Sequence, residues 1–345
     1  MESKTSILII YTGGTIGMVR DAKTGALKPF KFENLFKIIP SLEMLNYDIE
    51  SYCFDPPVDS SNMNPGFWAE LAGVIEKNYE SYDGFVVLHG SDTMAYTASA
   101  LSFMLQNLNK PVILTGSQLP LGMVRTDGRE NLITSIEIAA AKEDETPLVP
   151  EVCIYFENQL FRGNRTHKIN ADDFEAFRSP NYPVLADAGV YIKYNRNAIH
   201  NPNFKKLKVY KNLDQGIAIL KLFPGITEIT VKSILNIKGL KAVILESYGA
   251  GNAPTSDWFI RLLKNAIKKG LIIINVSQCE SGSVMMGKYE TSVRLKEVGV
   301  LGVFDITTEA AIAKLMYLLG NFSDKEKINK LIATSIVGEI TTSAG

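Results

Sequence analysis

Two short glycine-containing segments carry hydroxyl side chains where a strand is expected to end. The first reads Thr-Gly-Gly-Thr-Ile-Gly from Thr12 to Gly17 and follows an apolar run that ends at Tyr11. Glycines permit a sharp turn and a close approach of the backbone to a ligand, and the two threonines flank them. A plain glycine turn or a phosphate cradle at a helix start would give the same pattern. The segment has neither Gly-x-Gly-x-x-Gly nor Gly-Lys-Ser/Thr, so a nucleotide site is weakly supported.

The second segment reads His-Gly-Ser-Asp-Thr-Met from His89 to Met94. Ser91 or Asp92 could simply cap the next helix, since either side chain can accept hydrogen bonds from the free N–H groups of a first turn. A cap needs only one such residue, whereas three polar residues stand here in a row. Their position at the end of a second strand makes a functional role as reasonable as capping.

Two further polar segments are open to either interpretation. Residues 59–63 read Asp-Ser-Ser-Asn-Met and could be the N-cap of a helix. Lys168 ends the run Arg-Gly-Asn-Arg-Thr-His-Lys, and a lysine taken by itself is most simply a solvated surface residue.

The composition narrows the class of protein. The chain has 345 residues, 46% of them hydrophobic and 21% charged, with a formal net charge of −1. These are the values of a globular protein, and without a basic stripe neither nucleic acid nor an anionic membrane is an expected partner. A small molecule is the expected partner.

Histidine and cysteine are too sparse and too scattered for a metal centre. The three histidines form no His-x-x-x-His pattern, and no cysteine pair has metal-ligand spacing. We therefore expect neither a metal nor another cofactor. Three separated cysteines indicate free thiols in a reducing compartment, and the apolar run 7–11 is too short for a secretory core or a membrane span. The expected location is the cytoplasm.

Short β-rich runs alternate with helix-period segments, which predicts a parallel sheet wrapped by helices. The predicted strands are residues 6–11, 47–54, 84–89, 111–115 and 152–156, and the predicted helices are 65–79, 93–108 and 128–142. The helix from residue 93 is apolar almost all round, so we expect it to be buried. Ligands collect at the carboxyl ends of strands in open parallel sheets, and the hydroxyl-rich segments stand there.

A second alternating series follows a change of pattern after Asn181. Its predicted strands are residues 216–223, 240–246 and 271–277, and its predicted helices are 256–269, 308–319 and 324–333. The length exceeds what one core usually organises. We expect an N-terminal domain over residues 1–194, a linker over 195–213 and a C-terminal domain over 214–345. The fold class is α/β, with a larger, mostly parallel N-terminal sheet domain and a smaller parallel one.

Taken together, the two glycine-containing segments resemble the paired signature motifs of bacterial-type L-asparaginases. The resemblance continues through 59–63, 115–117, 127–128, the Lys168 segment and 249–254, and so spans nearly the whole chain. The motif Gly-Asn-Arg-Thr-x-Lys is similar to that of the cytoplasmic class. The resemblance implies hydrolysis of L-asparagine, possible turnover of L-glutamine, and a homodimer or homotetramer.

The resemblance also implies a mechanism. Thr15 would attack the side-chain carboxamide to give an acyl-enzyme that water hydrolyses. Ser91, Lys168 and Asp92 would supply the base that a threonine hydroxyl requires, while His89 would only support its loop. An ordinary lysine has a pKa near ~10.4, so a lysine that accepts a proton near neutral pH must be buried or lie beside positive charge. Lys168 would therefore lie inside the site.

Other residues would bind the substrate. Asp92 would accept from the α-ammonium, and residues 59–61 (Asp59, Ser60 and Ser61) would take the α-carboxylate. Backbone N–H groups around Gly14, Ser91 and Asp92 would stabilise the oxyanion. The Ser117 carbonyl would hold the leaving nitrogen. Asn252 would reach the α-ammonium of a neighbouring subunit's substrate.

The sequence departs from the family pattern in three places. Ser91 stands where most relatives have threonine, which keeps the hydroxyl but frees its rotamer. The expected lid, residues 18–30, lacks the usual tyrosine, and Ala26 falls near its position. His167 replaces a smaller residue beside Lys168. With Cys279, His167 would border a second, allosteric asparagine site, although Cys279 could equally be an inert residue at a strand end.

Three other functions remain open from the sequence. An asparaginase-like subunit of a tRNA-dependent amidotransferase usually has an extra N-terminal domain, and the first strand here begins at residue 6. A non-catalytic amino-acid-binding protein could retain the pocket without the lid tyrosine. A nucleotide-binding module would need a phosphate loop. Asparagine and glutamine differ by one methylene, worth about 1–3 kcal/mol, so the sequence does not set the preference between them.

Overall fold

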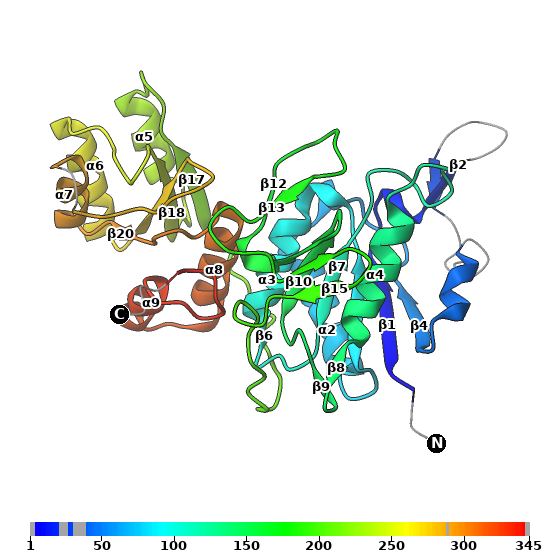
Figure 1. The fold of residues 1–345 in the computed structure, drawn as a ribbon. Coiled ribbons are helices and arrows are strands. Elements are labelled where there is room, and N and C mark those ends of the chain that lie inside the picture. The colour runs from blue at the N-terminus through cyan, green and yellow to red at the C-terminus, as the bar shows by residue number, and fades with distance from the viewer. Residues whose placement is uncertain (1–3, 21–26, 30–38, 288–289, 342–345) are drawn as a thin grey trace. The chain divides into compact units, whose positions relative to one another are not determined.

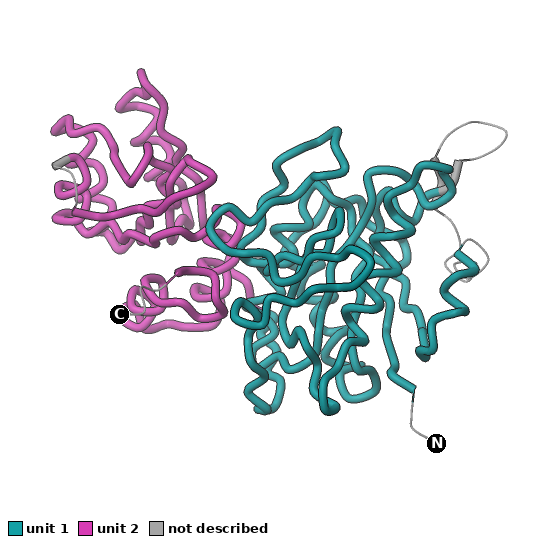
Figure 2. The backbone as a smooth tube through the Cα atoms, in the orientation of Figure 1, with its two compact units in different colours: residues 1–211 teal, residues 212–345 magenta. Residues whose placement is uncertain are grey.

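The computed structural model describes residues 4–20, 27–29, 39–287 and 290–341 (Figure 1). The chain divides into two compact units, residues 1–211 and 212–345 (Figure 2). Residues 195–211, taken from the sequence as part of a linker, are in the first unit.

The first unit is built on an eight-stranded sheet with the order β15-β14-β11-β10-β7-β5-β1-β4. Strands β4, β1, β5, β7 and β10 run parallel, and β11, β14 and β15 continue the sheet antiparallel. The strands are β1 (Ser6–Tyr11), β4 (Asp48–Cys53), β5 (Gly84–Leu88), β7 (Val112–Thr115), β10 (Val152–Phe156), β11 (Gln159–Arg162), β14 (Ala186–Ala188) and β15 (Ile192–Tyr194). The parallel strands correspond to the five predicted ones, so the predicted fold class is confirmed for this unit.

The central strands are almost wholly apolar. This is expected because helices cover both faces of the sheet and bury every side chain of such a strand. Every residue of β5 and β10 is buried. Ile7 and Ile9 of β1 pack in one core cluster with Leu132 and Ile136 of helix α4 (Gly128–Ala140). In Figure 1, α4 lies on one side of the sheet and α2 (Pro65–Asn78) and α3 (Met94–Met104) on the other.

Helix α3 is buried as predicted, with Tyr96 the one residue in it that is not. It ends at Met104, however, and not near Leu108 as predicted. Leu105 and Gln106 form strand β6, which pairs antiparallel with β16 (Lys208–Val209). Asn107 then turns the chain with a φ of 60°. A pairing with a segment about a hundred residues away therefore overrides the local helical pattern.

Short elements complete the first unit. Strand β12, which carries Lys168, pairs antiparallel with β13. The short elements are β2 (Met18–Arg20), β3 (Leu27–Pro29), β8 (Lys142–Glu143), β9 (Thr146–Pro147), β12 (His167–Lys168), β13 (Phe177–Arg178), and the 3₁₀ turns η1 (Thr15–Gly17), η3 (Pro40–Met44), η4 (Ser60–Asn62), η5 (Ser91–Thr93) and η6 (Gly163–Arg165).

The second unit has a four-stranded parallel sheet with the order β17-β18-β19-β20. Its elements are β17 (Ile217–Lys221), α5 (Glu228–Leu235), β18 (Ala242–Ser247), α6 (Asp257–Lys268), β19 (Ile272–Ser277), α7 (Glu290–Glu297), β20 (Leu301–Gly302), α8 (Thr308–Asn321) and α9 (Lys325–Ile332). The predicted smaller parallel-sheet domain is confirmed. Helices α5 and α7 have no counterpart in the prediction.

A buried ion pair fixes the end of the second unit. Lys314 Nζ lies 2.6 Å from Glu339 Oε1, and their side chains are only 2% and 0% exposed. The amine also donates to the carbonyl of Ile332, and the carboxylate accepts from the backbone N–H groups of Ile336 and Val337. Burial lowers the pKa of Lys314, and the Glu339 carboxylate opposes that shift.

Replacing Lys314 by methionine is expected to destabilise the protein strongly. Methionine has a side chain of similar length, but it leaves the Glu339 carboxylate buried without a counter-charge. Such a change typically lowers the free energy of unfolding by about 3–5 kcal/mol. Urea unfolding at neutral pH should show this loss, and the double variant Lys314→Met/Glu339→Gln should recover part of it. An unchanged unfolding midpoint in the single variant would show that the pair contributes no stability.

Candidate active site

The predicted hydroxyl residues meet at one edge of the first unit's sheet. Thr15 follows β1, Ser60 follows β4, Ser91 follows β5 and Ser117 follows β7. These four strands are parallel neighbours in the order β7-β5-β1-β4, so their carboxyl ends lie side by side. The structure thus brings together residues that are far apart in the sequence.

Glycines let three of these loops touch through their backbones. A Cβ atom on Gly13 would lie 2.1 Å from the Val58 carbonyl oxygen, and one on Gly14 would lie 2.6 Å from the Gly90 Cα. A Cβ on Gly90 would lie 2.5 Å from Ser60 Oγ. Gly14 also has a φ of 91°, which other residues rarely adopt. Thr15 directly follows Gly14, and Ser91 directly follows Gly90. Because these two glycines are in contact, the backbones of Thr15 and Ser91 start from neighbouring positions.

Lys168 joins two of the predicted residues. Its Nζ donates to Ser91 Oγ at 2.8 Å and to Asp92 Oδ1 at 2.6 Å. The Lys168 side chain is 17% exposed, against 69% for that of Asp92. Two short hydrogen bonds and a low exposure distinguish Lys168 from a freely solvated lysine.

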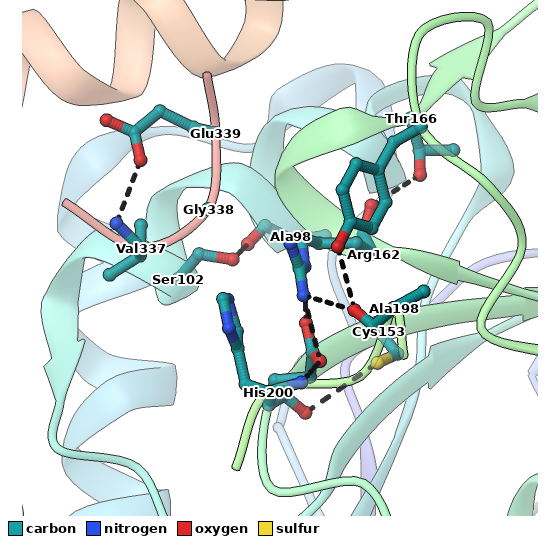
Figure 3. Close-up of polar contacts among 12 residues, drawn as sticks. Ala98, Ser102, Cys153, Arg162, Thr166, Ala198, His200, Val337, Gly338 and Glu339 are labelled. Carbon is teal, nitrogen blue, oxygen red and sulfur yellow. Dashed lines mark hydrogen bonds and ion pairs between the residues drawn. The ribbon is translucent and has the colours of Figure 1, made fainter. Parts of the chain in front are cut away.

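A buried cation holds the segment that carries Lys168. Arg162 Nε donates to Glu151 Oε2 at 2.6 Å, and its Nη2 donates to the Ala198 carbonyl at 2.8 Å. The Thr166 hydroxyl donates to the Arg162 carbonyl at 2.7 Å, which closes the turn before Lys168 (Figure 3). Because the pair Arg162–Glu151 is almost fully buried, with side chains 4% and 7% exposed, it fixes this turn firmly.

His89 is buried and supports its own loop. Its Nδ1 lies 2.7 Å from the Gly90 carbonyl, which can only accept, so Nδ1 carries the proton. Its Nε2 then accepts from the Thr97 hydroxyl at 2.9 Å, and Thr97 Oγ1 accepts from Trp68 Nε1 at 2.9 Å. Burial lowers the pKa of His89 to about 4, opposed by the hydrogen bond to Gly90. A neutral imidazole with both nitrogens occupied fits a support role and leaves no free base.

The lowered pKa of His89 predicts a loss of stability in acid. Between pH 6.5 and about pH 4 the unfolded chain binds a proton at His89 that the folded chain does not bind. The free energy of unfolding should therefore fall over this range, by up to about 3 kcal/mol from this group. Urea unfolding of the wild type and of His89→Gln at several pH values should show the difference between them changing in this window. Parallel pH curves would contradict the assignment.

The expected carboxylate-binding residues are partly engaged with one another. Asp59 Oδ1 accepts from the Ser61 hydroxyl at 2.6 Å and from its backbone N–H at 2.9 Å, and these bonds lower the pKa of Asp59. Asp59 thus caps the 3₁₀ turn η4, whereas the helix that follows, α2, is capped by Asn64. Ser60 is buried, and its carbonyl accepts from the Thr93 hydroxyl at 2.7 Å. This bond ties the loop after β4 to the loop after β5.

Sequence analysis missed Gln118, which links three parts of the site. Its Oε1 accepts from the Ser91 hydroxyl at 3.4 Å, and its Nε2 donates to the Asp173 carbonyl at 2.8 Å. Its backbone N–H donates to Asp127 Oδ2 at 2.9 Å. Gln118 follows Ser117 at the end of β7, so the rule about carboxyl ends pointed to this position. Only the three-dimensional contact with Ser91 marks it as part of the site.

The remaining predicted residues are divided between the two units. Asn252 and Cys279 belong to the second unit and His167 to the first. Ala26, at the expected place of the lid tyrosine, lies outside the described residues. Over the described ranges, no group of three His, Cys, Asp or Glu side chains could hold a metal ion. No helix in the described part of the chain has the length and apolar character to cross a membrane.

Known proteins match this chain over both units. Residues 6–200 match the family described as Asparaginase, N-terminal, and residues 216–332 match that described as Glutaminase/Asparaginase C-terminal domain. The chain is 43% identical over 341 residues to L-asparaginase 1 of Escherichia coli strain K12, covering 98% of each chain. It is 32% identical over 346 residues to a Glutamyl-tRNA(Gln) amidotransferase subunit of Pyrococcus abyssi, covering 97% of this chain and 76% of that protein. The crystal structure of L-asparaginase I from Vibrio cholerae O1 biovar eltor superposes with a TM-score of 0.90 at 39% identity, covering 99% of this chain and 100% of that one.

Proposed function

The chain belongs to the asparaginase family, and from this premise we propose that it hydrolyses the side-chain amide of L-asparagine to L-aspartate and ammonia. The observation that carries the proposal is the hydrogen-bonded group of Ser91, Lys168 and Asp92 beside the glycine contact that presents Thr15. The protein is thus an amidohydrolase.

Thr15 is the proposed nucleophile. Its hydroxyl oxygen bonds to the carboxamide carbon while its proton passes to a base, which gives a tetrahedral oxyanion. Collapse of this intermediate breaks the C–N bond, and the nitrogen leaves as ammonia after taking up a proton. Water then attacks the acyl-threonine ester and releases aspartate with the Thr15 hydroxyl restored. Backbone N–H groups of the touching loops around Gly14, Ser91 and Asp92 are the proposed oxyanion donors.

Ser91 and Lys168 are the proposed proton path. The Lys168 amine lies 2.8 Å from Ser91 Oγ, a distance at which a proton can pass between them. Asp92 holds the amine from the other side at 2.6 Å. This group then activates Thr15 in place of a lid tyrosine, and its members come from η5 and β12 of the first unit.

The α-groups of the substrate have proposed partners as well. Asp92 accepts from the α-ammonium, residues 59–61 receive the α-carboxylate, and the Ser117 carbonyl accepts from the amide nitrogen. Asn252 approaches the α-ammonium from a neighbouring copy of the chain, which makes the active form a homodimer or a homotetramer. None of the three cysteines is in a disulfide, which supports the cytoplasm as the location.

Ammonia release from L-asparagine by the purified protein tests the proposal. We expect one ammonia and one aspartate per turnover without tRNA or a partner protein, and the same assay with L-glutamine sets the preference. Ammonia release that required a partner and tRNA would favour a role in an amidotransferase, in line with the similarity to the Pyrococcus abyssi protein. Aspartate binding without ammonia release from asparagine would identify a binding protein instead.

A further inference from the structure

The turn that carries Asn252 is held at each of its carbonyl groups. Tyr248 and Asn252 exchange two backbone hydrogen bonds at 2.9 and 2.8 Å, which closes the turn. Inside it, the Gly249 carbonyl accepts from the Ser277 hydroxyl at 2.7 Å. The Gly251 carbonyl accepts from the buried Asn275 amide at 3.1 Å. The backbone of this turn is therefore rigid.

A rigid backbone does not by itself orient the Asn252 amide. The last torsion of an asparagine side chain is broad, so the amide can rotate unless a hydrogen bond holds it. Thr291 provides that bond: its hydroxyl donates to Asn252 Oδ1 at 2.6 Å. Thr291 lies at the start of α7. The bond therefore joins this helix to a turn that lies 39 residues earlier in the sequence. An amide oxygen has two lone pairs, and one remains for a second donor.

We propose that Thr291 is a positioning residue that orients the Asn252 amide oxygen toward the α-ammonium of the substrate. The inference rests on the proposed function, because it assumes that Asn252 contacts substrate. Thr291 itself touches no substrate. Its hydroxyl holds the amide in one rotation, in which a lone pair of Oδ1 remains to accept from the ammonium.

The test compares Thr291→Val with Thr291→Ser. The valine variant loses the hydroxyl at nearly constant volume, and the KM for L-asparagine should rise about five- to tenfold, as expected for one lost hydrogen bond. The kcat should stay within about twofold, because the α-ammonium is held equally in the ground and transition states. Thr291→Ser keeps the hydroxyl and should restore the KM.

A matched control and a double variant separate positioning from general damage. Thr230→Val removes a hydroxyl from the first turn of α5, where it bonds the exposed Thr227, and it should leave both constants unchanged. Adding Thr291→Val to Asn252→Ala should not raise the KM further, since the two residues act through one contact.

Each failure has its own signature. If Asn252→Ala raises the KM while Thr291→Val does not, the positioning role is overturned and the proposed function stands. If Thr291→Val raises the KM by the same factor with and without the Asn252 side chain, Thr291 acts by another route and the inference is again overturned. If Asn252→Ala leaves the KM unchanged, Asn252 contacts no substrate and the inference fails with that part of the proposed function.

Discussion

Thr15→Ala is expected to lower kcat for ammonia release by a factor of at least about 10³, the usual cost of removing a nucleophile. Alanine leaves no oxygen to form the acyl-enzyme. The backbone of the touching loops does not depend on the Thr15 side chain, because Gly14 and Gly90 make that contact. The fold should therefore persist, with the urea midpoint close to that of the wild type.

The covalent intermediate gives this prediction an independent check. Rapid acid quenching of the wild type with L-asparagine should yield an acylated peptide that contains Thr15, and the alanine variant should yield none. Thr15→Ser keeps the hydroxyl and should retain part of the activity. An alanine variant within tenfold of the wild type would mean that another group, such as Ser91, is the nucleophile.

Lys168→Met is expected to lower kcat by about 10²- to 10⁴-fold, the range for loss of general base catalysis. Methionine approximates the length of lysine but has no amine that could take up the proton passed on by Ser91. Asp92 loses its partner as well, but its side chain is 69% exposed and water can replace the lysine there. The effect should therefore appear in turnover and not in stability.

Lys142→Met is the matched control for this variant. Lys142 Nζ lies 3.0 Å from Asp83 Oδ1, and the Lys142 side chain is 22% exposed, close to the 17% of Lys168. Both lysines belong to the first unit and both lose an ion pair. Turnover close to that of the wild type is expected in Lys142→Met. Equal activities in the two variants would remove Lys168 from the mechanism.

The sequence alone determined the parallel strands and the loops that carry the hydroxyls. Buried parallel strands leave continuous apolar runs in the sequence, and their ends are marked by glycine and polar residues. Thr15 and Ser91 could therefore be placed at one edge of a sheet before any contact was known. The paired glycine segments also indicated the family, which the matches over both units confirm.

Only the tertiary structure decided where the charged side chains lie. Lys168 is 77 residues from Ser91, and nothing in its local sequence separates a site lysine from a surface one. Its place follows from the buried pair Arg162–Glu151 and the pairing of β12 with β13. Likewise, Gln118 joins the site through its contact with Ser91, and α3 ends early because β6 pairs with β16. Local periodicity reports which face of an element is buried, whereas the environment of a charge depends on groups that only folding brings near.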